Sequence, residues 1–182
     1  MTERRDELLR RSREYLLAHG VADLSLRPLA AAVGTSARLL VYHFGSKEAL
    51  VTAVLDDVRS RFQASFAASS HGRLEKRRGH PLMAFWKTLI QPANRGYLRL
   101  LVEVQALALT NPTSYGRYLE TTSTSWLEVV ESALGPSKRR RARATLGVAV
   151  VDGLVLELLA TGDVRRTTEA LALFTERARG PA

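Results

Sequence analysis

The sequence predicts an all-α fold, with a small N-terminal domain of three helices followed by a C-terminal helical bundle. Apolar residues recur at helical spacing along almost the whole chain, and the alternation typical of strands is absent. Glycines and prolines fall between the periodic segments. We therefore expect an N-terminal domain over residues 1–46 and a C-terminal domain over residues 47–182, in which residues 47–68 form a long connecting helix.

Glycine and serine stand where short helices would end and begin in the N-terminal segment. We expect helices over about residues 3–19, 26–33, 36–42 and 47–68. A glycine follows each of the first three helices, at Gly20, Gly34 and Gly45. A hydroxyl residue that can cap the helix N-terminus precedes each of the last three, at Ser25, at Thr35 or Ser36, and at Ser46.

Prolines divide the remainder of the chain. Pro81, Pro112 and Pro136 each lie where a helix would begin, because the first helical turn tolerates the missing N–H. The expected helices lie near residues 81–91, 95–110, 112–134, 137–161 and 163–179. The polar, basic stretch 69–80 is interpreted as a loop.

The chain contains no cysteine, which excludes disulfides and is typical of a reducing cytoplasm. Its first residues, MTERRDELLRR, carry charges where a secretory signal needs an apolar core. Residues 146–162 are apolar but short for a membrane span, and they include Asp152 and Glu157. We expect a cytoplasmic protein without a membrane partner, in which residues 146–162 form a buried helix.

The formal net charge of +9 indicates an acidic partner, and nucleic acid is the first candidate. The charge does not locate the site, because residues 1–66 hold ten basic and eight acidic side chains. The basic runs 73–78 and 137–143 could contact phosphates. A solvated helix face is the simpler interpretation of the second run, and the first stays open.

Two short helices joined by a turn at Gly34 are the ingredients of a helix-turn-helix, which makes residues 1–46 a candidate DNA-binding domain. In that motif the first residues of the second helix meet base edges in the major groove. These residues are Thr35, Ser36, Ala37 and Arg38. Arg38 is the long cation among them, and its planar fork can donate two hydrogen bonds to guanine. The alternative roles for Arg38 are a phosphate contact and plain solvation.

Residues 25–50, SLRPLAAAVGTSARLLVYHFGSKEAL, resemble the DNA-binding segment of the TetR family of bacterial regulators. The matching features are Ser25, Arg27, the alanine pair 30–31, Gly34, Ser36, the run 42–44 and the run Ser46-Lys47-Glu48 followed by Leu50. The resemblance is close over about residues 4–60. Farther along it depends on the layout of the helices and on VDGLVLELLATGD, residues 151–163, which is similar to the penultimate helix of many members.

The resemblance implies a role for each matching residue. Phosphate contacts or register would come from Ser25, Arg27, Thr35, Ser36, Tyr42, His43 and Lys47, while Ala37 and Arg38 would face bases. Hydroxyls and a lysine at helix N-termini suit phosphate oxygens. Val41 is a departure, because many members carry a tyrosine there that reaches the DNA backbone. Leu39 is also bulkier than the small residue often found at its position.

The C-terminal bundle would hold an unknown small-molecule effector. Its candidate contacts are Phe85, Trp86, Tyr97, Glu103 and Trp126. Core packing is the usual role of aromatics at helical spacing, and solvent exposure at the helix edge is the simpler explanation for Glu103. A polar residue on a mostly apolar helix nevertheless needs a partner.

Dimerisation is expected because the last two helices are apolar over more than one face. Four such helices from two chains would form a bundle with two-fold symmetry. The candidate interface residues are Gly147, Val150, Leu154, Leu158, Leu171 and Phe174. In the alternative interpretation, the penultimate helix is the buried centre of a monomer.

No enzyme, metal or cofactor is expected. The histidines His19, His43, His71 and His80 form no metal-ligand spacing with a carboxylate, and neither a phosphate-binding glycine loop nor a nucleophile elbow occurs. The function implied is a sequence-specific transcriptional regulator, a homodimeric repressor released from a near-palindromic DNA operator by its effector. The alternative is a non-specific nucleic-acid-binding or helical scaffolding protein without ligand control.

Overall fold

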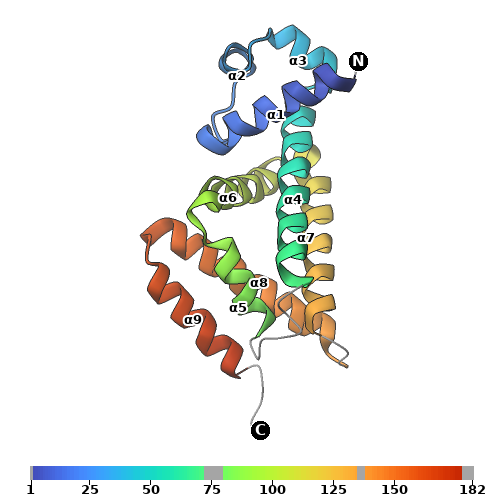
Figure 1. Cartoon of the computed structure of the whole chain (residues 1–182). Coiled ribbons are helices and arrows are strands. Elements are labelled where there is room, and N and C mark those ends of the chain that lie inside the picture. Colours follow the sequence, from blue (N-terminus) through green and yellow to red (C-terminus); the bar gives the residue numbers. More distant parts are fainter. Residues whose placement is uncertain (1, 72–79, 135–137, 178–182) are drawn as a thin grey trace. The chain divides into compact units, whose positions relative to one another are not determined.

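The computed structural model describes residues 2–71, 80–134 and 138–177, and all elements assigned in these ranges are helices (Figure 1). The all-α prediction is confirmed. The elements are α1 (Thr2–His19), α2 (Leu26–Ala32), α3 (Ala37–Phe44), α4 (Lys47–His71), α5 (Pro81–Leu89), the 3-10 turn η1 (Pro92–Asn94), α6 (Arg95–Thr110), α7 (Pro112–Leu134), α8 (Arg140–Thr161) and α9 (Val164–Arg177).

Local signals explain most helix ends. Ser36 caps α3, since its Oγ accepts from the Leu39 N–H at 3.2 Å, and the Ser46 Oγ accepts from the Ala49 N–H at 3.0 Å at the start of α4. Both caps are as predicted. Ser25 does precede α2, but its side chain forms no capping hydrogen bond, so the prediction of a hydroxyl cap there is wrong.

Some boundaries differ from the prediction. Helix α4 reaches at least His71, the last described residue before the gap, and so passes the expected end near residue 68. Helix α5 ends at Leu89 and is followed by η1, and α8 begins at Arg140 instead of residue 137. The basic run 73–78 and residue 137 lie outside the described residues.

The helices form two compact units, neither of which is continuous in sequence. Unit 1 contains residues 1–65 and 99–119. Its buried side chains come from all its helices: Leu8, Leu16, Leu29, Leu40, Leu50, Val54, Leu100, Val104 and Tyr115. An ion pair of 2.7 Å between Arg13 and Asp57 joins α1 to α4 within this unit. The smaller part of unit 1 comes from α6 and α7, which are far from α1 to α4 in the sequence.

Unit 2 contains residues 66–98 and 120–182. Here α9 packs against both α5 and α8. Trp86 is completely buried, and its Nε1–H donates to the Thr168 Oγ1 of α9 at 2.8 Å. Because α4, α6 and α7 each contribute to both units, the compact units do not coincide with a boundary at residue 46. That boundary stays a prediction about function.

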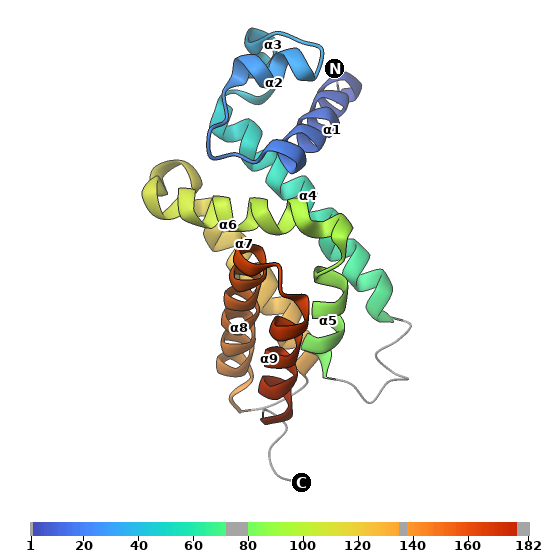
Figure 2. The ribbon, with the colours of Figure 1, turned by 90° about the vertical axis from the view of Figure 1, so that its left-hand side faces the viewer.

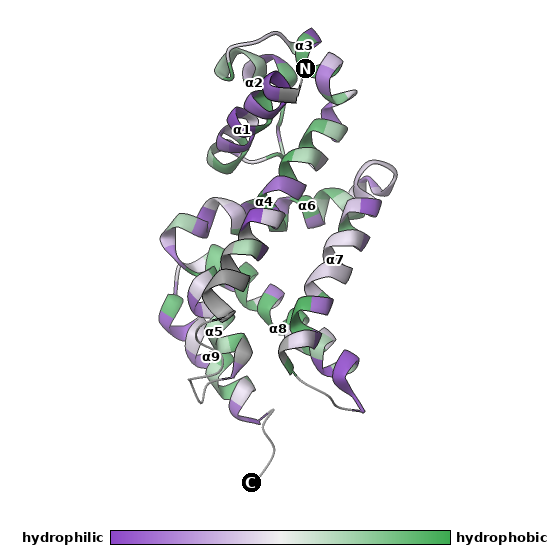
Figure 3. Ribbon diagram, turned by 45° about the vertical axis from the view of Figure 1, so that its right-hand side comes forward, coloured by the Kyte–Doolittle hydropathy of each residue, from purple (hydrophilic) through white to green (hydrophobic). Residues whose placement is uncertain are grey.

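Helix α8 has two apolar faces, and hydrophobic residues predominate along it (Figure 3). Ala144, Gly147, Val151 and Val155 form its buried face. Among the described helices it is long and apolar enough to cross a membrane, yet only 28% of its apolar window is buried. One such helix does not indicate a membrane protein. The expectation of a simply buried helix holds for one face alone.

Candidate nucleic-acid interface

Helices α2 and α3 and the turn between them form a helix-turn-helix in unit 1 (Figure 2). Gly34 has a φ of +73°, a conformation that side chains disfavour, and its N–H donates to the Ala31 carbonyl at 3.3 Å. The Thr35 N–H donates to the Ala30 carbonyl at 2.9 Å. These bonds close the end of α2 and set the direction in which α3 leaves.

Helix α1 is hydrogen-bonded to the residues just before the turn. The Arg11 Nη1 donates to the Val33 carbonyl at the end of α2 at 3.3 Å, and its Nε donates to Glu7 at 2.6 Å. Glu7 also accepts from Arg10 at 2.8 and 2.9 Å. Hydrogen bonds from Arg10 and then Arg11 lower the pKa of Glu7 to about 2. Glu7 is therefore ionised at neutral pH and keeps Arg11 in place.

The far end of α3 is anchored by Phe44. This ring is 9% exposed, and the Arg5 guanidinium of α1 lies 4.9 Å from its centroid, close enough for a cation–π contact. Gly45 then ends the helix with a φ of +89°, and its N–H donates to the Val41 carbonyl at 2.7 Å. Both ends of α3 are thus fixed to the rest of unit 1.

One face of α3 points inward and the other outward. Leu40 is completely buried beside Phe44. The outward residues Arg38 and Tyr42 are exposed, Tyr42 at 68%, with Val41 at 40% beside them. Within the described ranges Arg38 forms no ion pair, so its guanidinium is available to an incoming partner.

The other predicted DNA contacts differ in accessibility. Ser25, Arg27 and Ser36 are exposed, whereas Ala37, His43 and Lys47 are half-buried. The Lys47 Nζ lies 3.9 Å from a Glu48 oxygen, a distance at which the lysine can still turn toward a phosphate. Thr35 is the exception, because its Oγ1 is buried and forms no hydrogen bond with the described residues. The geometry does not support the expected phosphate contact through this hydroxyl.

Glu103 has a partner that sequence reasoning did not consider. Its Oε2 accepts from the Val21 N–H, in the connection between α1 and α2, at 2.6 Å. One turn earlier on α6, the Arg99 Nη2 donates to the Leu17 carbonyl in the last turn of α1 at 3.0 Å. Arg99 and Glu103 are 3.5 Å apart. Helix α6 is therefore hydrogen-bonded to the end of α1, and Glu103 has partners within the protein instead of being simply solvated.

The aromatic ligand candidates lie in unit 2. Phe85, Trp86 and Tyr97 are buried, and the ring centroids of Phe85 and half-buried Trp126 are 5.2 Å apart. Glu103 belongs to unit 1, so the five predicted contacts do not form one cluster within either unit. The Phe85–Trp126 pair is the part of the prediction that remains together.

Two of the six predicted dimer residues are turned inward and four are half-buried. Leu171 is completely buried, and a Cβ on Gly147 would lie 3.0 Å from Leu82, so neither can supply interface area. The half-buried residues are Val150, Leu154, Leu158 and Phe174. Opposite the buried face of α8 runs an exposed stripe: Ala142, Leu146, Ala149, Gly153, Leu156 and Ala160. Helical spacing from the buried face could have located this stripe.

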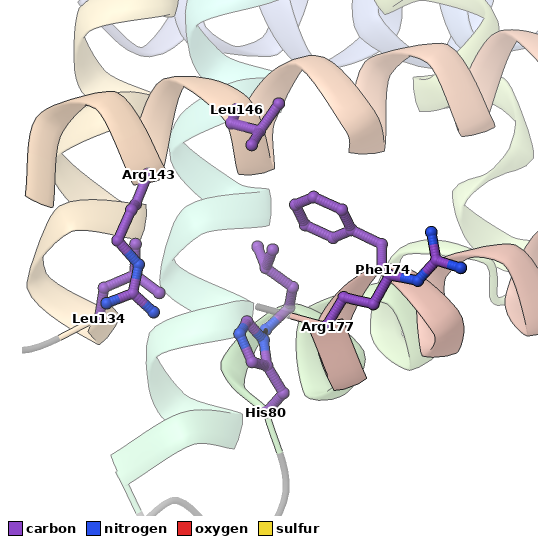
Figure 4. A pocket seen from close by; sticks show the side chains of 7 residues that line it. His80, Leu134, Arg143, Leu146, Phe174 and Arg177 are labelled. Carbon is purple, nitrogen blue, oxygen red and sulfur yellow. Dashed lines mark hydrogen bonds between the residues drawn. The ribbon is translucent and has the colours of Figure 1, made fainter. Parts of the chain in front are cut away.

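A hollow of about 290 Å³ in unit 2 is lined by His80, Leu82, Leu134, Arg143, Leu146, Phe174 and Arg177. Figure 4 shows the ring of Phe174 of α9 turned toward it, the exposed Leu146 of α8 at its edge, and the guanidinium groups of Arg143 and Arg177 apart from each other. None of the predicted ligand contacts lines this hollow. It belongs to the α8–α9 side of unit 2.

A model of the bacterial regulatory proteins of the tetR family matches residues 8–54, the segment that contains the whole helix-turn-helix. This segment, residues 8–54, belongs to the TetR family. The HTH-type transcriptional repressor AcnR of Corynebacterium diphtheriae is 24% identical over 187 residues, which cover 98% of this chain and 93% of AcnR. The protein is a transcriptional regulator that contains a TetR-family segment and has a repressor among its relatives.

Solved structures show the same fold along nearly the whole chain. A TetR-family regulator from Rhodococcus sp. has a TM-score of 0.77 at 23% identity and covers 98% of both chains. A regulator from Saccharomonospora viridis, solved with choline, has a TM-score of 0.78 at 18% identity and covers 97% of both chains. At these identities the likeness concerns the fold.

Proposed function

We propose that this protein is a homodimeric repressor that binds a near-palindromic operator through α3 and leaves it when a small molecule binds unit 2. The observation that carries the proposal is the outward face of α3, where exposed Arg38 has no ion-pair partner among the described residues. Guanine offers two acceptors in the major groove that match the guanidinium fork. AcnR, a repressor, is similar over nearly the whole chain.

Selection of bound sequences from random duplexes tests DNA recognition. Wild-type protein should enrich one motif with two related halves, and Arg38→Ala should lose the preference at one guanine in each half. Arg10→Ala is the matched control, because Arg10 is held by Glu7 and Glu14 at 2.8 and 2.7 Å and should leave the motif unchanged. Uniform weakening with an intact motif would make Arg38 a phosphate contact. Binding without any preference at fixed salt would favour the non-specific alternative.

The proposed dimer uses the exposed stripe of α8. Leu146 is 55% and Leu156 is 56% exposed, and a Cβ built on Gly153 meets nothing within 4 Å. A second copy would bury these side chains, and Gly153 would let two helices approach closely. The half-buried candidates Val150, Leu154, Leu158 and Phe174 would border the contact.

Sedimentation of Gly153→Arg and Leu156→Glu tests this interface. Both substitutions lie on the outward face, so the monomer should keep its helical content while the dimer dissociates. Ser123→Arg is the control, because Ser123 is exposed on α7, a different helix from the one that carries the stripe. Monomeric wild-type protein at micromolar concentration would contradict the proposal.

The proposed effector contacts Phe85 and Trp126 in unit 2, with Trp86 and Tyr97 in the same unit. The relative from Saccharomonospora viridis was solved with choline. Aromatic faces suit such a cation. Helix α6 begins in unit 2, and within unit 1 its Glu103 and Arg99 are hydrogen-bonded to the end of α1 and the residues that follow it. A ligand that shifts α6 would therefore change the contacts that position the helix-turn-helix.

A thermal-shift screen that starts with quaternary ammonium compounds tests effector binding, because a ligand of the folded state raises the melting temperature. A true effector should also release the selected operator, and Trp126→Ala should weaken both effects. A ligand that stabilises the protein without releasing DNA would contradict the coupling. We further propose a cytoplasmic location, no enzymatic activity, and no metal or cofactor. Among the described residues no cluster of metal-ligating side chains occurs.

A further inference from the structure

Helix α3 exposes aliphatic side chains on a surface where polar residues would ordinarily face water. Val41 is 40% and Leu39 is 46% exposed, although both belong to a helix of only eight residues. Leu40 and Phe44 already supply its buried side. The exposed aliphatic groups therefore contribute little to the packing of unit 1, and a contact outside the chain would bury them.

Helical geometry places one of these groups beside Arg38. Successive residues are turned by about 100°, so Val41 lies about 60° from Arg38 around the axis and Tyr42 about 40° from it on the other side. Leu39 is about 100° away. Val41 therefore shares the outward face of Arg38, and Leu39 lies at its border.

We propose, on the basis of the DNA-binding function proposed above, that Val41 reads a thymine in each half-site. A valine side chain cannot donate or accept a hydrogen bond. The apolar feature that base edges present in the major groove is the C5-methyl group of thymine. Val41 is thus a specificity-determining residue, and the operator carries a thymine methyl next to the guanine read by Arg38.

The distance along the helix limits where this thymine lies. Three residues span about 4.5 Å along the axis of α3, and neighbouring base pairs are about 3.4 Å apart. A guanine read by Arg38 and a thymine read by Val41 are then one or two base pairs apart, on either strand. Tyr42, on the other side of Arg38, does not need an apolar partner on a base, because its hydroxyl can form a hydrogen bond with a phosphate.

Replacing single thymines of the selected operator by deoxyuridine tests the proposal, because this change removes only the methyl group. Uracil at the proposed position should weaken wild-type binding about fourfold per half-site, which corresponds to about 0.8 kcal/mol for one buried methyl. In Val41→Ala the same replacement should have almost no effect. In Leu39→Ala, the matched control, it should keep its full effect.

Several outcomes would overturn the proposal. One is an operator without a thymine within two base pairs of the Arg38-dependent guanine, and another is an equal uracil penalty in wild type and Val41→Ala. A penalty that disappears in Leu39→Ala instead would assign the thymine to Leu39. Circular dichroism of each variant verifies folding. Val41→Thr, whose side chain has nearly the same shape as that of valine, provides a second variant in case Val41→Ala does not fold. If selection enriches no sequence at all, the proposed function fails first, which separates the two failures.

Discussion

Gly20 offers a sharp test of the contact between α6 and the end of α1. Its φ is +83°, and a Cβ built on it would lie 2.6 Å from both carboxylate oxygens of Glu103. Gly45 has a similar φ of +89°, but a Cβ there meets nothing within 4 Å. The two glycines, both in unit 1, thus separate backbone strain from displacement of Glu103.

The expected costs follow from these geometries. Alanine in the left-handed region costs about 1–2 kcal/mol, which is the whole expected effect of Gly45→Ala. Gly20→Ala must also push Glu103 away from the Val21 N–H, and a hydrogen bond to a charged group contributes about 1.5–3 kcal/mol. The free energy of unfolding should therefore fall by about 2.5–5 kcal/mol in Gly20→Ala.

Urea unfolding followed by circular dichroism measures both variants. In a Glu103→Ala background, the penalty of Gly20→Ala should fall to about that of Gly45→Ala, because no carboxylate remains to be displaced. Equal costs for Gly20→Ala and Gly45→Ala would refute the reasoning. So would a Gly20→Ala penalty that is the same with and without Glu103.

Three further predictions concern stability. Burial acts to raise the pKa of Asp57, but hydrogen bonds from Arg61 and Arg13 outweigh it and the pKa is lowered from 3.8. The contribution of Asp57 to the free energy of unfolding is thus complete above pH 3.8 and is lost as the pH falls through the lowered pKa. When unfolding is measured against pH, Arg13→Gln should lose less stability in acid than the wild type. An unchanged loss of stability in acid would contradict the ion pair. Thr168→Val leaves the buried Nε1–H of Trp86 without its acceptor and should lower the free energy of unfolding by about 1–3 kcal/mol, whereas a neutral effect in denaturant melts would argue against the bond. Leu171→Ala should lower the free energy of unfolding by about 2–5 kcal/mol, because Leu171 is completely buried. The exposed neighbour Leu173 should tolerate alanine within about 0.5 kcal/mol. Similar costs for the two variants in the same melts would contradict the burial of this face of α9.

Features with local causes were predictable from the sequence. Gly34 and Gly45 end helices because of their own backbone conformations, and the Ser36 and Ser46 caps involve N–H groups three residues away. The ordered pattern from Ser25 to Leu50 likewise identified the helix-turn-helix. Arg38 remains the candidate base reader, because the structure leaves it exposed on the outward face of α3.

Features that depend on distant partners were not predictable. The burial of the Thr35 hydroxyl depends on how the turn packs in unit 1. Glu103 interrupts an apolar helix without indicating its partner, because Val21 is 82 residues away in the chain. Periodicity showed that α8 is apolar on more than one face, but not which face the monomer buries.

The sequence by itself determined the all-α class, the helix-turn-helix and the positions of its turns, because these depend on residues within a few places of one another. Tertiary structure alone decided which side chains are available. It turned Leu171 and Gly147 inward, left Leu146 and Leu156 outward, and joined Glu103 to the end of α1. The physical reason is that exposure and hydrogen-bond partners depend on which helices pack together, and that packing brings together residues far apart in the chain.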